Sequence, residues 1–404
     1  MASPGRQRAD AARWHTVSQI LAVLSRQPGI TRAAMARELG LTSGFATEII
    51  ARMRDLRLLT EAPAPAGGRG RPTTVLHPHP DGPVVLAVDL RQGEWLHAVV
   101  GVDGQLHDLR RDPHQSRRPA TVLGAVRRTV DRTLVRYGGR LRAVSLAVAA
   151  TINDRHLVQS STLGWGPVDL GTLTSGTSLP LLVGNDATLA GVAEARTGAA
   201  TTAGTALHLI VEAGIGGALT VDGQPVTGAH GAAGEYGHLP LGDRRLRCPC
   251  GARGCWELDV DGRALARHLG DPAPTDPRRY ARDVLDRAGH DSRAGQAVAT
   301  VAQALATGIA GLVNIHDPDL ITLGGLGPTI RGAAELTFQN AYTDGLMAAH
   351  RSRPPPIVDA THGNDGPLRG AAIIGLDHAT GESSLADWAT GRRDPAPHSA
   401  SARP

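Results

Sequence analysis

The chain of 404 residues contains no lysine, only three cysteines, and few aromatic residues, which make up 3% of it. Three cysteines cannot form a closed set of disulfides, which argues against a disulfide-stabilised scaffold. No apolar run approaches the length of a membrane span, and the N-terminus lacks the apolar core of a signal peptide. These absences predict a cytoplasmic protein with reduced thiols and no membrane partner.

The positive charge is concentrated at the N-terminal end of the chain. The whole sequence carries a formal charge of +4, whereas residues 1–80, with eleven arginines and five acids, carry +6. The other residues therefore sum to −2. The length is sufficient for two or three domains. A basic head on a slightly acidic body predicts that only the head meets a polyanion.

Residues 1–80 show the pattern of a winged helix-turn-helix domain with its linker. A first helix is predicted from the apolar spacing i, i+3, i+4 and i+7 of Val17, Ile20, Leu21 and Leu24. Thr31 and Thr42 are typical N-caps of two further helices, which we expect to end at about Leu39 and Leu56. Two short strands follow, on either side of a turn rich in proline and glycine.

The third helix of this head is the candidate recognition helix for operator DNA. One of its faces carries small or hydrogen-bonding side chains, which allow close entry into a major groove, namely Ser43, Gly44, Thr47 and Arg54. Arg69 and Arg71 lie between glycines at the wing tip and could enter a narrow minor groove. The alternatives are a small protein-docking bundle for the helices and a solvated loop for the wing.

All three cysteines lie close to one histidine in the sequence. The four residues are His238, Cys248, Cys250 and Cys255. Three thiolates and one imidazole complete a tetrahedral zinc shell with no position for a catalytic water, so the predicted zinc is structural. Gly251 and Gly254 allow the loop to fold back on itself. The alternative is a loop with three reduced thiols and no metal.

The body repeats one pattern twice, which indicates an α/β protein with two lobes. A strand, a glycine-containing turn, a second strand and the tetrad Val-Asp-Gly-Gln occur in 84–105 and again in 207–224. Each copy is followed by a helix and another strand. We expect an actin-like (ribonuclease-H-like) architecture with lobes 81–185 and 186–363, a helix 364–379 completing the first lobe, and a disordered tail 380–404.

Four motifs in the body resemble those of the ROK family of bacterial sugar kinases and sugar-responsive repressors. They are Gly234-Glu-Tyr-Gly-His238, the cysteine run from Cys248 to Glu257, Gly184-Asn-Asp-Ala187, and Asp317-Pro318 leading to Gly325. The resemblance extends from Ala11 to about Ala379. The N-terminal head and Gly70-Arg-Pro72 are similar to the regulator branch of the family.

The resemblance implies a carbohydrate site in the cleft between the lobes. The implied hexose ligands are Asn185, Asp186, Glu235, His238 and Glu257, with Asp186 matching the catalytic base of the kinases. Each acid also has a structural interpretation: Asp186 as a helix cap, Glu235 as a solvated loop acid, and Glu257 as the partner of an arginine such as Arg253. The resemblance further implies a homodimer or homotetramer.

Departures from the kinase motifs indicate a protein that has lost ATP binding. The phosphate turn Asp-x-Gly-x-Thr is replaced by Asp89-Leu-Arg-Gln-Gly93, and Gly-Thr-Gly-x-Gly by Glu212-Ala-Gly-Ile-Gly216. A carboxylate facing a triphosphate is unfavourable by on the order of several kcal/mol. The family's Pro-Gly turn also reads Ala149-Ala-Thr151. This departure leaves two alternatives, an unusual sugar as ligand or a sugar site that has drifted.

The sequence therefore favours a non-enzymatic, sugar-responsive DNA-binding regulator, most consistent with a repressor. Asp186 is then only a vestigial base. Two alternatives stay open: an ATP-dependent sugar kinase with a DNA-binding head, and a regulator that responds to no sugar or to a phosphorylated protein.

Overall fold

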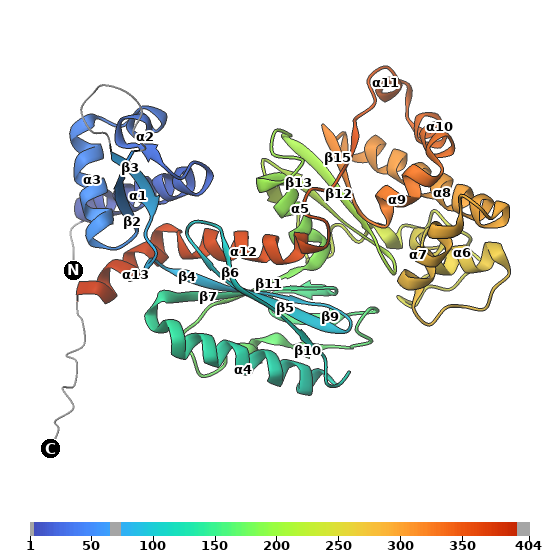
Figure 1. The fold of residues 1–404 in the computed structure, drawn as a ribbon, viewed down its shortest axis with the longest axis horizontal. Coiled ribbons are helices and arrows are strands. Elements are labelled where there is room, and N and C mark those ends of the chain that lie inside the picture. Colours follow the sequence, from blue (N-terminus) through green and yellow to red (C-terminus); the bar gives the residue numbers. More distant parts are fainter. Residues whose placement is uncertain (1–3, 65–73, 394–404) are drawn as a thin grey trace.

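A computed structural model describes residues 4–64 and 74–393, which form a small head and a body of two lobes (Figure 1). The head contains α1 (Pro4–Arg26), α2 (Arg32–Glu38) and α3 (Ser43–Asp55). Its sheet has the order β1-β3-β2, with β1 at Ile30–Thr31, β2 at Leu59–Pro63 and β3 at Thr74–Pro78. The hydroxyls of the two predicted caps accept hydrogen bonds from the backbone at the starts of α2 and α3. The winged helix prediction is confirmed.

The first lobe is a five-stranded sheet with a helix on each face. Its strand order is β11-β7-β4-β5-β6, with β4 at Val84–Leu90, β5 at Glu94–Gly101, β6 at Leu106–Pro113, β7 at Leu141–Val148 and β11 at Leu181–Asn185. Strand β4 is buried along its whole length because α4 (Pro119–Tyr137) covers one face and α12 (Gly366–Ala379) the other. A small sheet of β8 (Thr151–Asn153), β9 (His156–Gln159) and β10 (Val168–Asp169) extends from the ends of these strands.

The second lobe repeats this arrangement, as the duplicated sequence pattern predicts. Its sheet has the order β14-β13-β12-β15-β16, with β12 at Thr205–Val211, β13 at Ile215–Val221, β14 at Gln224–Pro225, β15 at Leu320–Gly325 and β16 at Ile357–Asp359. In both lobes an antiparallel hairpin, β4–β5 or β12–β13, is followed by a strand parallel to its first member. Helix α5 (Asp186–Thr197) packs against β13, β12 and α12, between the two sheets.

The other face of the second sheet is covered by helices. They are α6 (Gly262–Leu269), α7 (Pro277–Arg287), α8 (Ser292–His316), α9 (Gly327–Ala333), α10 (Glu335–Gly345) and α11 (Ala348–Arg351). By length and composition alone, α8 could cross a membrane, with a mean hydropathy of 1.6 over its most apolar stretch. Its buried residues pack into the core of the lobe, which accounts for this apolar character.

The prediction of a disordered tail over 380–404 is wrong for residues 382–393. Residues 382–393 form α13 (Glu382–Arg393), which lies against α1 of the head (Figure 1). Its apolar residues Leu385, Trp388 and Ala389 are at most 4% exposed and belong to the core of the head. The apolar face of this helix consists of only these three residues, and the rest of the segment is rich in small and polar residues. The composition of the segment therefore did not predict a helix. Residues 394–404 lie outside the described part of the chain.

Candidate metal cluster and ligand cleft

The four predicted metal ligands meet at one point in the second lobe. Their ligand atoms all lie within 4.8 Å of one another. Sγ of Cys250 and Sγ of Cys255 are 3.7 Å apart, and Sγ of Cys248 is 3.8 Å from Nδ1 of His238. These are the edges expected of a tetrahedron around zinc, where bonds of 2.3 Å place sulfurs about 3.8 Å apart. The cluster could therefore hold a metal ion.

The loop reaches this geometry through two left-handed glycines. Gly251 has a φ of 100° and Gly254 a φ of 73°, which other residues rarely adopt. The backbone N–H of Cys248 donates a 2.9 Å hydrogen bond to the carbonyl of Ala252, so the chain reverses within a few residues. This reversal brings Cys255 back to Cys248 and Cys250. Cys255 also precedes the short helix η4 (Trp256–Asp259), which carries Glu257.

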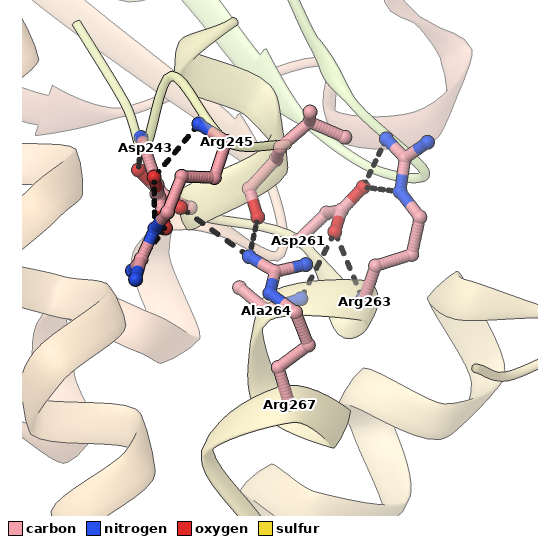
Figure 2. A network of polar contacts seen from close by, with 8 residues as sticks. Asp243, Arg245, Asp261, Arg263, Ala264 and Arg267 are labelled. Atoms are coloured by element: carbon pink, nitrogen blue, oxygen red, sulfur yellow. Dashed lines mark hydrogen bonds and ion pairs between the residues drawn. The ribbon is translucent and has the colours of Figure 1, made fainter. Parts of the chain in front are cut away.

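Arginine–aspartate pairs lie on both sides of the cysteine loop in the sequence, in the segment before it and at α6 after it (Figure 2). Asp261 is fully buried, caps α6 and accepts a 2.6 Å hydrogen bond from Nε of Arg263. Arg263 also donates to the carbonyl of Ala213 at 3.2 Å. Arg267 reaches Asp259 at 3.3 Å, and Asp243 pairs with Arg245 at 2.7 Å. The loop is thus linked to the turn after β12, which replaces the second phosphate turn.

The ring of His238 faces the cysteines with one nitrogen and Glu235 with the other. Nδ1 lies beside Cys248, while Nε2 is 3.8 Å from Oε2 of Glu235. Metal binding through Nδ1 would leave Nε2 to carry the proton toward this carboxylate. Glu235 in turn accepts a 2.8 Å hydrogen bond from the hydroxyl of Thr151. Glu235 is thus engaged on two sides and is not a free loop acid.

Glu257 lies against the metal cluster. Its Oε1 is 3.2 Å from Sγ of Cys248 and 3.5 Å from Nη2 of Arg263, and the residue is 8% exposed. The arginine partner suggested by the sequence, Arg253, instead donates to the carbonyl of Arg245. Glu257 therefore has an ion-pair partner, but a different one from the residue we expected.

Asn185 and Asp186 stand at the start of α5, where the first lobe meets the second. Asn185 is the N-cap: its Oδ1 accepts a 3.0 Å hydrogen bond from the backbone of Thr188, and its Nδ2 donates to the carbonyl of Ala150 at 3.1 Å. Asp186 is the first helical residue and not the cap, which corrects the structural alternative. Burial raises the pKa of Asp186 to about 6, and the charge of Glu235 acts in the same direction.

Two arginine–carboxylate pairs occupy the turns that replace the phosphate loops. Nε of Arg91 donates to Asp89 at 2.6 Å, and Arg278 pairs with Glu212. Burial raises the pKa of Asp89, which is 1% exposed, to about 7, although Arg91 lowers it. Both arginines also donate hydrogen bonds to Asn364. Arg91 donates to its backbone carbonyl at 2.6 Å, and Arg278 donates to its side-chain oxygen at 3.1 Å.

Sequence reasoning missed these arginines and Thr151 as cleft residues. Arg91 was visible only as the residue replacing a motif glycine. Arg278 lies 66 positions beyond Glu212, so nothing local in the sequence pairs them. By contrast, Trp165 is 5% exposed and donates a hydrogen bond to the carbonyl of Arg117, which places it in the core of the first lobe.

The head presents the expected polar face on α3. Ser43, Gly44, Thr47 and Arg54 are all exposed, while Ala46, Ile49 and Met53 on the opposite face are at most 4% exposed. The hydroxyl of Thr47 donates to the carbonyl of Ser43 at 2.9 Å. A Cβ added to Gly44 would meet nothing within 4 Å. Arg69 and Arg71 lie outside the described residues.

Comparison with known proteins identifies both parts of the chain. The model of the ROK family matches residues 85–378, which is well over half of the sequence. This chain belongs to the ROK family. A MarR family model matches residues 15–70, which cover α2, α3 and the second half of α1. This ROK protein therefore combines a MarR-type winged helix head with a two-lobed body of the actin-like sugar kinase fold.

Individual relatives include both kinases and a regulator. An N-acetyl-D-glucosamine kinase from Pectobacterium carotovorum is 33% identical over 186 residues, covering 42% of this chain and 58% of the relative. The chain thus spans little more than half the length of the curated kinases it matches. A ROK family transcriptional regulator, a homologue of the E. coli MLC protein, superimposes with a TM-score of 0.76 at 20% identity, covering 94% of this chain and 100% of that one.

The kinase structures match the body but not the head. A ROK family glucokinase from Streptomyces griseus, solved with glucose and AMPPNP, superimposes with a TM-score of 0.59 at 22% identity and covers 72% of this chain and 98% of its own. At such identities the match shows the fold alone. The regulator structure covers 94% of this chain, whereas the glucokinase structure covers 72%. This difference agrees with a head that is added to a body with the kinase fold.

Proposed function

We propose that this ROK protein is a DNA-binding transcription regulator, acting as a repressor, whose cleft binds a sugar without phosphorylating it. The family of the body and the MarR-type head support a regulator. The regulator structure that covers both parts supports the same arrangement of domains.

The observation that carries the non-catalytic part is the filling of both phosphate turns by charged pairs. In a kinase these turns offer glycine amides and hydroxyls to a triphosphate. Here the Asp89–Arg91 pair occupies the first turn and the Glu212–Arg278 pair the second. Nucleotide binding would require separating these two ion pairs, of which Asp89–Arg91 is hydrogen-bonded with Asp89 buried, and placing two carboxylates near the phosphates. Both requirements are unfavourable.

The sugar would contact the residues that the family resemblance implies, with a distinct contribution from each. Ionised Asp186 and Glu235 would accept hydrogen bonds from ring hydroxyls, and Nε2–H of His238 would donate one. Asn185 already bonds Ala150 and Thr188, so its first role is to fix the start of α5. Glu257 would act through its contacts with Cys248 and Arg263.

Zinc would be structural in this mechanism. The three sulfurs and Nδ1 of His238 have the donor types and separations of a closed tetrahedral site, with no position left for water. A bound zinc ion would supply a rigid anchor for the loop. His238 and Glu257 would then be held at fixed positions beside the cleft.

DNA binding would use α3 in a major groove, with the two heads of a homodimer on neighbouring half-sites. A sugar that changes the angle between the lobes would change the spacing of these heads. Because half-sites lie on a duplex of fixed pitch, altered spacing lowers the affinity for the operator.

The second candidate is an ATP-dependent sugar kinase carrying a DNA-binding head. It is favoured by the N-acetyl-D-glucosamine kinases among the relatives and by the retained Asp186, whose raised pKa of about 6 suits a general base near neutral pH.

Two measurements on the purified full-length protein separate these functions. In the first, DNA fragments are selected from genomic DNA by the protein, and binding is followed by fluorescence anisotropy with and without N-acetyl-D-glucosamine, glucose and their 6-phosphates. In the second, the same sugars are incubated with ATP and magnesium and assayed for ADP. We expect specific DNA binding weakened by one sugar and no ADP above background. Steady turnover of ATP with any of these sugars would make the protein a kinase.

A further inference from the structure

The start of α12 lies at the cleft and contacts both lobes. The short helix η5 (Gly363–Asp365), which leads into α12, includes Asn364. Asn364 accepts one hydrogen bond from Arg91 of the first lobe and another from Arg278 of the second lobe. A change in the angle between the lobes must therefore move this end of α12 or break one of these bonds.

Helix α12 is packed too closely against its neighbours to slide independently of them. A Cβ on Gly370 would lie 1.9 Å from the carbonyl oxygen of Leu189 in α5, and one on Gly375 would lie 3.1 Å from the side chain of Val85 in β4. The approach at Gly370 is possible only for glycine, so α12 and α5 share a tight interface, and the contact at Gly375 packs α12 closely on β4. Arg196 of α5 and Asp377 of α12 also form a two-contact ion pair at 3.0 and 3.2 Å.

The chain passes from α12 into α13 with almost no interruption. Only Thr380 and Gly381 separate the two helices, and their amides bond carbonyls of the last turn of α12. The amide of Leu385 then bonds the carbonyl of Gly381 at 3.0 Å. Figure 1 shows the two helices following one another from the lobes to the head. The connection is thus short and hydrogen-bonded, unlike a flexible linker.

Helix α13 holds the recognition helix at its C-terminal end. The indole Nε1–H of Trp388 donates a 2.9 Å hydrogen bond to the carbonyl of Leu56, which is the C-cap of α3. Trp388 is 4% exposed and shares the apolar core of the head with Trp14 and Met53. His15 of α1 additionally pairs with Glu382 at the start of α13 at 2.9 Å.

We propose that α12 and α13 form a lever that transmits the state of the cleft to the DNA-binding head, with Trp388 as the positioning residue that holds the end of α3. This inference deepens the proposed function, since it names the route by which a sugar would act on DNA. The lever joins the point where both lobes contact Asn364 to the carbonyl end of the recognition helix. Movement at the cleft therefore alters the orientation of α3.

The first test loosens the joint of the lever and leaves its two ends docked. Two glycines inserted after Gly381 add flexible backbone between α12 and α13. We expect this variant to bind the selected DNA within about threefold of the wild type, whereas the loss of DNA affinity caused by the sugar shrinks at least fivefold. A sugar response equal to that of the wild type would overturn the lever while leaving the proposed function intact.

A second measurement tests the lever without any sugar. It therefore also applies if no sugar changes DNA binding by the wild type. R91A removes a hydrogen bond to Asn364 at the cleft, and hydrogen exchange is measured over residues 50–60 and 382–393. The lever predicts faster exchange in both segments in R91A than in the wild type. It predicts equal exchange in the glycine-insertion variant with and without R91A. Unchanged exchange in R91A would overturn the lever. The proposed function fails separately, if no sugar alters DNA binding by the wild type.

The role of Trp388 is tested by replacing its indole with a phenyl ring, which removes the N–H group together with part of the ring volume. W388F keeps an aromatic ring in the core but cannot donate to Leu56. W14F is the matched control, because Trp14 lies in the same core and does not bond the C-cap of α3. We expect W388F, and not W14F, to lower DNA affinity about fivefold and to reduce the sugar response. Equal behaviour of the two variants would reduce Trp388 to a packing residue.

Discussion

The hydroxyl of Thr151 donates a 2.8 Å hydrogen bond to Oε1 of Glu235. Thr151 belongs to β8 of the first lobe, and Glu235 precedes the metal-cluster histidine of the second. The bond therefore joins the two lobes across the cleft. It also occupies an acceptor that a sugar hydroxyl would otherwise use, at the turn where this sequence departs from the Pro-Gly of its family.

Removing this hydroxyl should increase the affinity for sugar. In T151V the shape of the side chain is nearly kept, but Glu235 is left free to accept from the ligand. A neutral or charge-assisted hydrogen bond contributes about 0.5–2 kcal/mol, so we expect sugar affinity to rise roughly two- to thirtyfold by calorimetry. T162V provides a control at a partly buried loop position of the same lobe. A lower affinity in T151V would mean that Thr151 itself binds the sugar.

Sugar binding should weaken in mild acid because of Asp186. Its pKa is raised to about 6 by burial and by Glu235. The ionised form, present above this pKa, is the better acceptor for hydroxyls, so affinity should be full at pH 7.5 and fall as the pH drops through 6. The dissociation constant is measured from pH 5 to 8.

D186N should abolish most of this pH dependence. Ionising a buried carboxylate with a raised pKa disfavours the folded state, and D186N cannot ionise. The free energy of unfolding of D186N should therefore exceed that of the wild type by more at pH 8 than at pH 5. A pH profile of sugar affinity that is the same in D186N and wild type would assign the titration to another group.

The arginine in the first phosphate turn should matter most for stability at alkaline pH. R91A leaves Asp89 buried without its partner, which costs about 1–3 kcal/mol when the carboxylate is ionised. The pKa of Asp89 is about 7 with Arg91 present, and it rises further without it because Arg91 lowers it. At pH 5.5 Asp89 is then neutral, and the loss is smaller than at pH 8.

Urea unfolding at the two pH values measures this difference. R111A is the control, since Arg111 is exposed and pairs at 3.3 Å with the partly exposed Glu94. An equal loss of stability in R91A at both pH values would show that Asp89 does not titrate in this range.

The cysteine loop should carry about one zinc ion per chain. Elemental analysis of protein purified without chelator should find this stoichiometry, and C250S should lose it together with sugar binding. H268Q, which changes an exposed histidine outside the cluster, should keep both. If the wild-type protein contains no stoichiometric metal, the four side chains do not form a metal site and contribute only to packing.

A large side chain at Gly44 should abolish DNA binding and leave the fold intact. Nothing lies within 4 Å of a Cβ at this position, and replacing a helical glycine stabilises the helix by up to about 1 kcal/mol. On a surface that enters a groove, however, leucine would prevent close approach. We expect DNA affinity to fall at least about tenfold in G44L, with no loss of thermal stability.

G332L is the matched control for this substitution. Gly332 is also helical and also has open space around its Cβ, but it lies in α9 of the second lobe. Its DNA affinity should equal that of the wild type. If G44L binds DNA normally, α3 does not enter a groove by this face.

The sequence by itself determined the elements whose signals are local. Caps at Thr31 and Thr42, the apolar stripe of the first helix and the duplicated hairpins all depend on residues a few positions apart, so the head and both lobes could be predicted. The metal cluster was equally accessible, because three of its ligands lie within eight residues and zinc chemistry restricts the residue types.

Only the tertiary structure decided which distant residues meet. Arg278 reaches Glu212 across 66 positions, Thr151 reaches Glu235 across 84, and Trp388 reaches Leu56 across 332. A short apolar stripe in a tail of ordinary composition has no partner in the sequence itself. It becomes the helix α13 because the core of the head, assembled from the other end of the chain, offers Leu385 and Trp388 a surface to bury against.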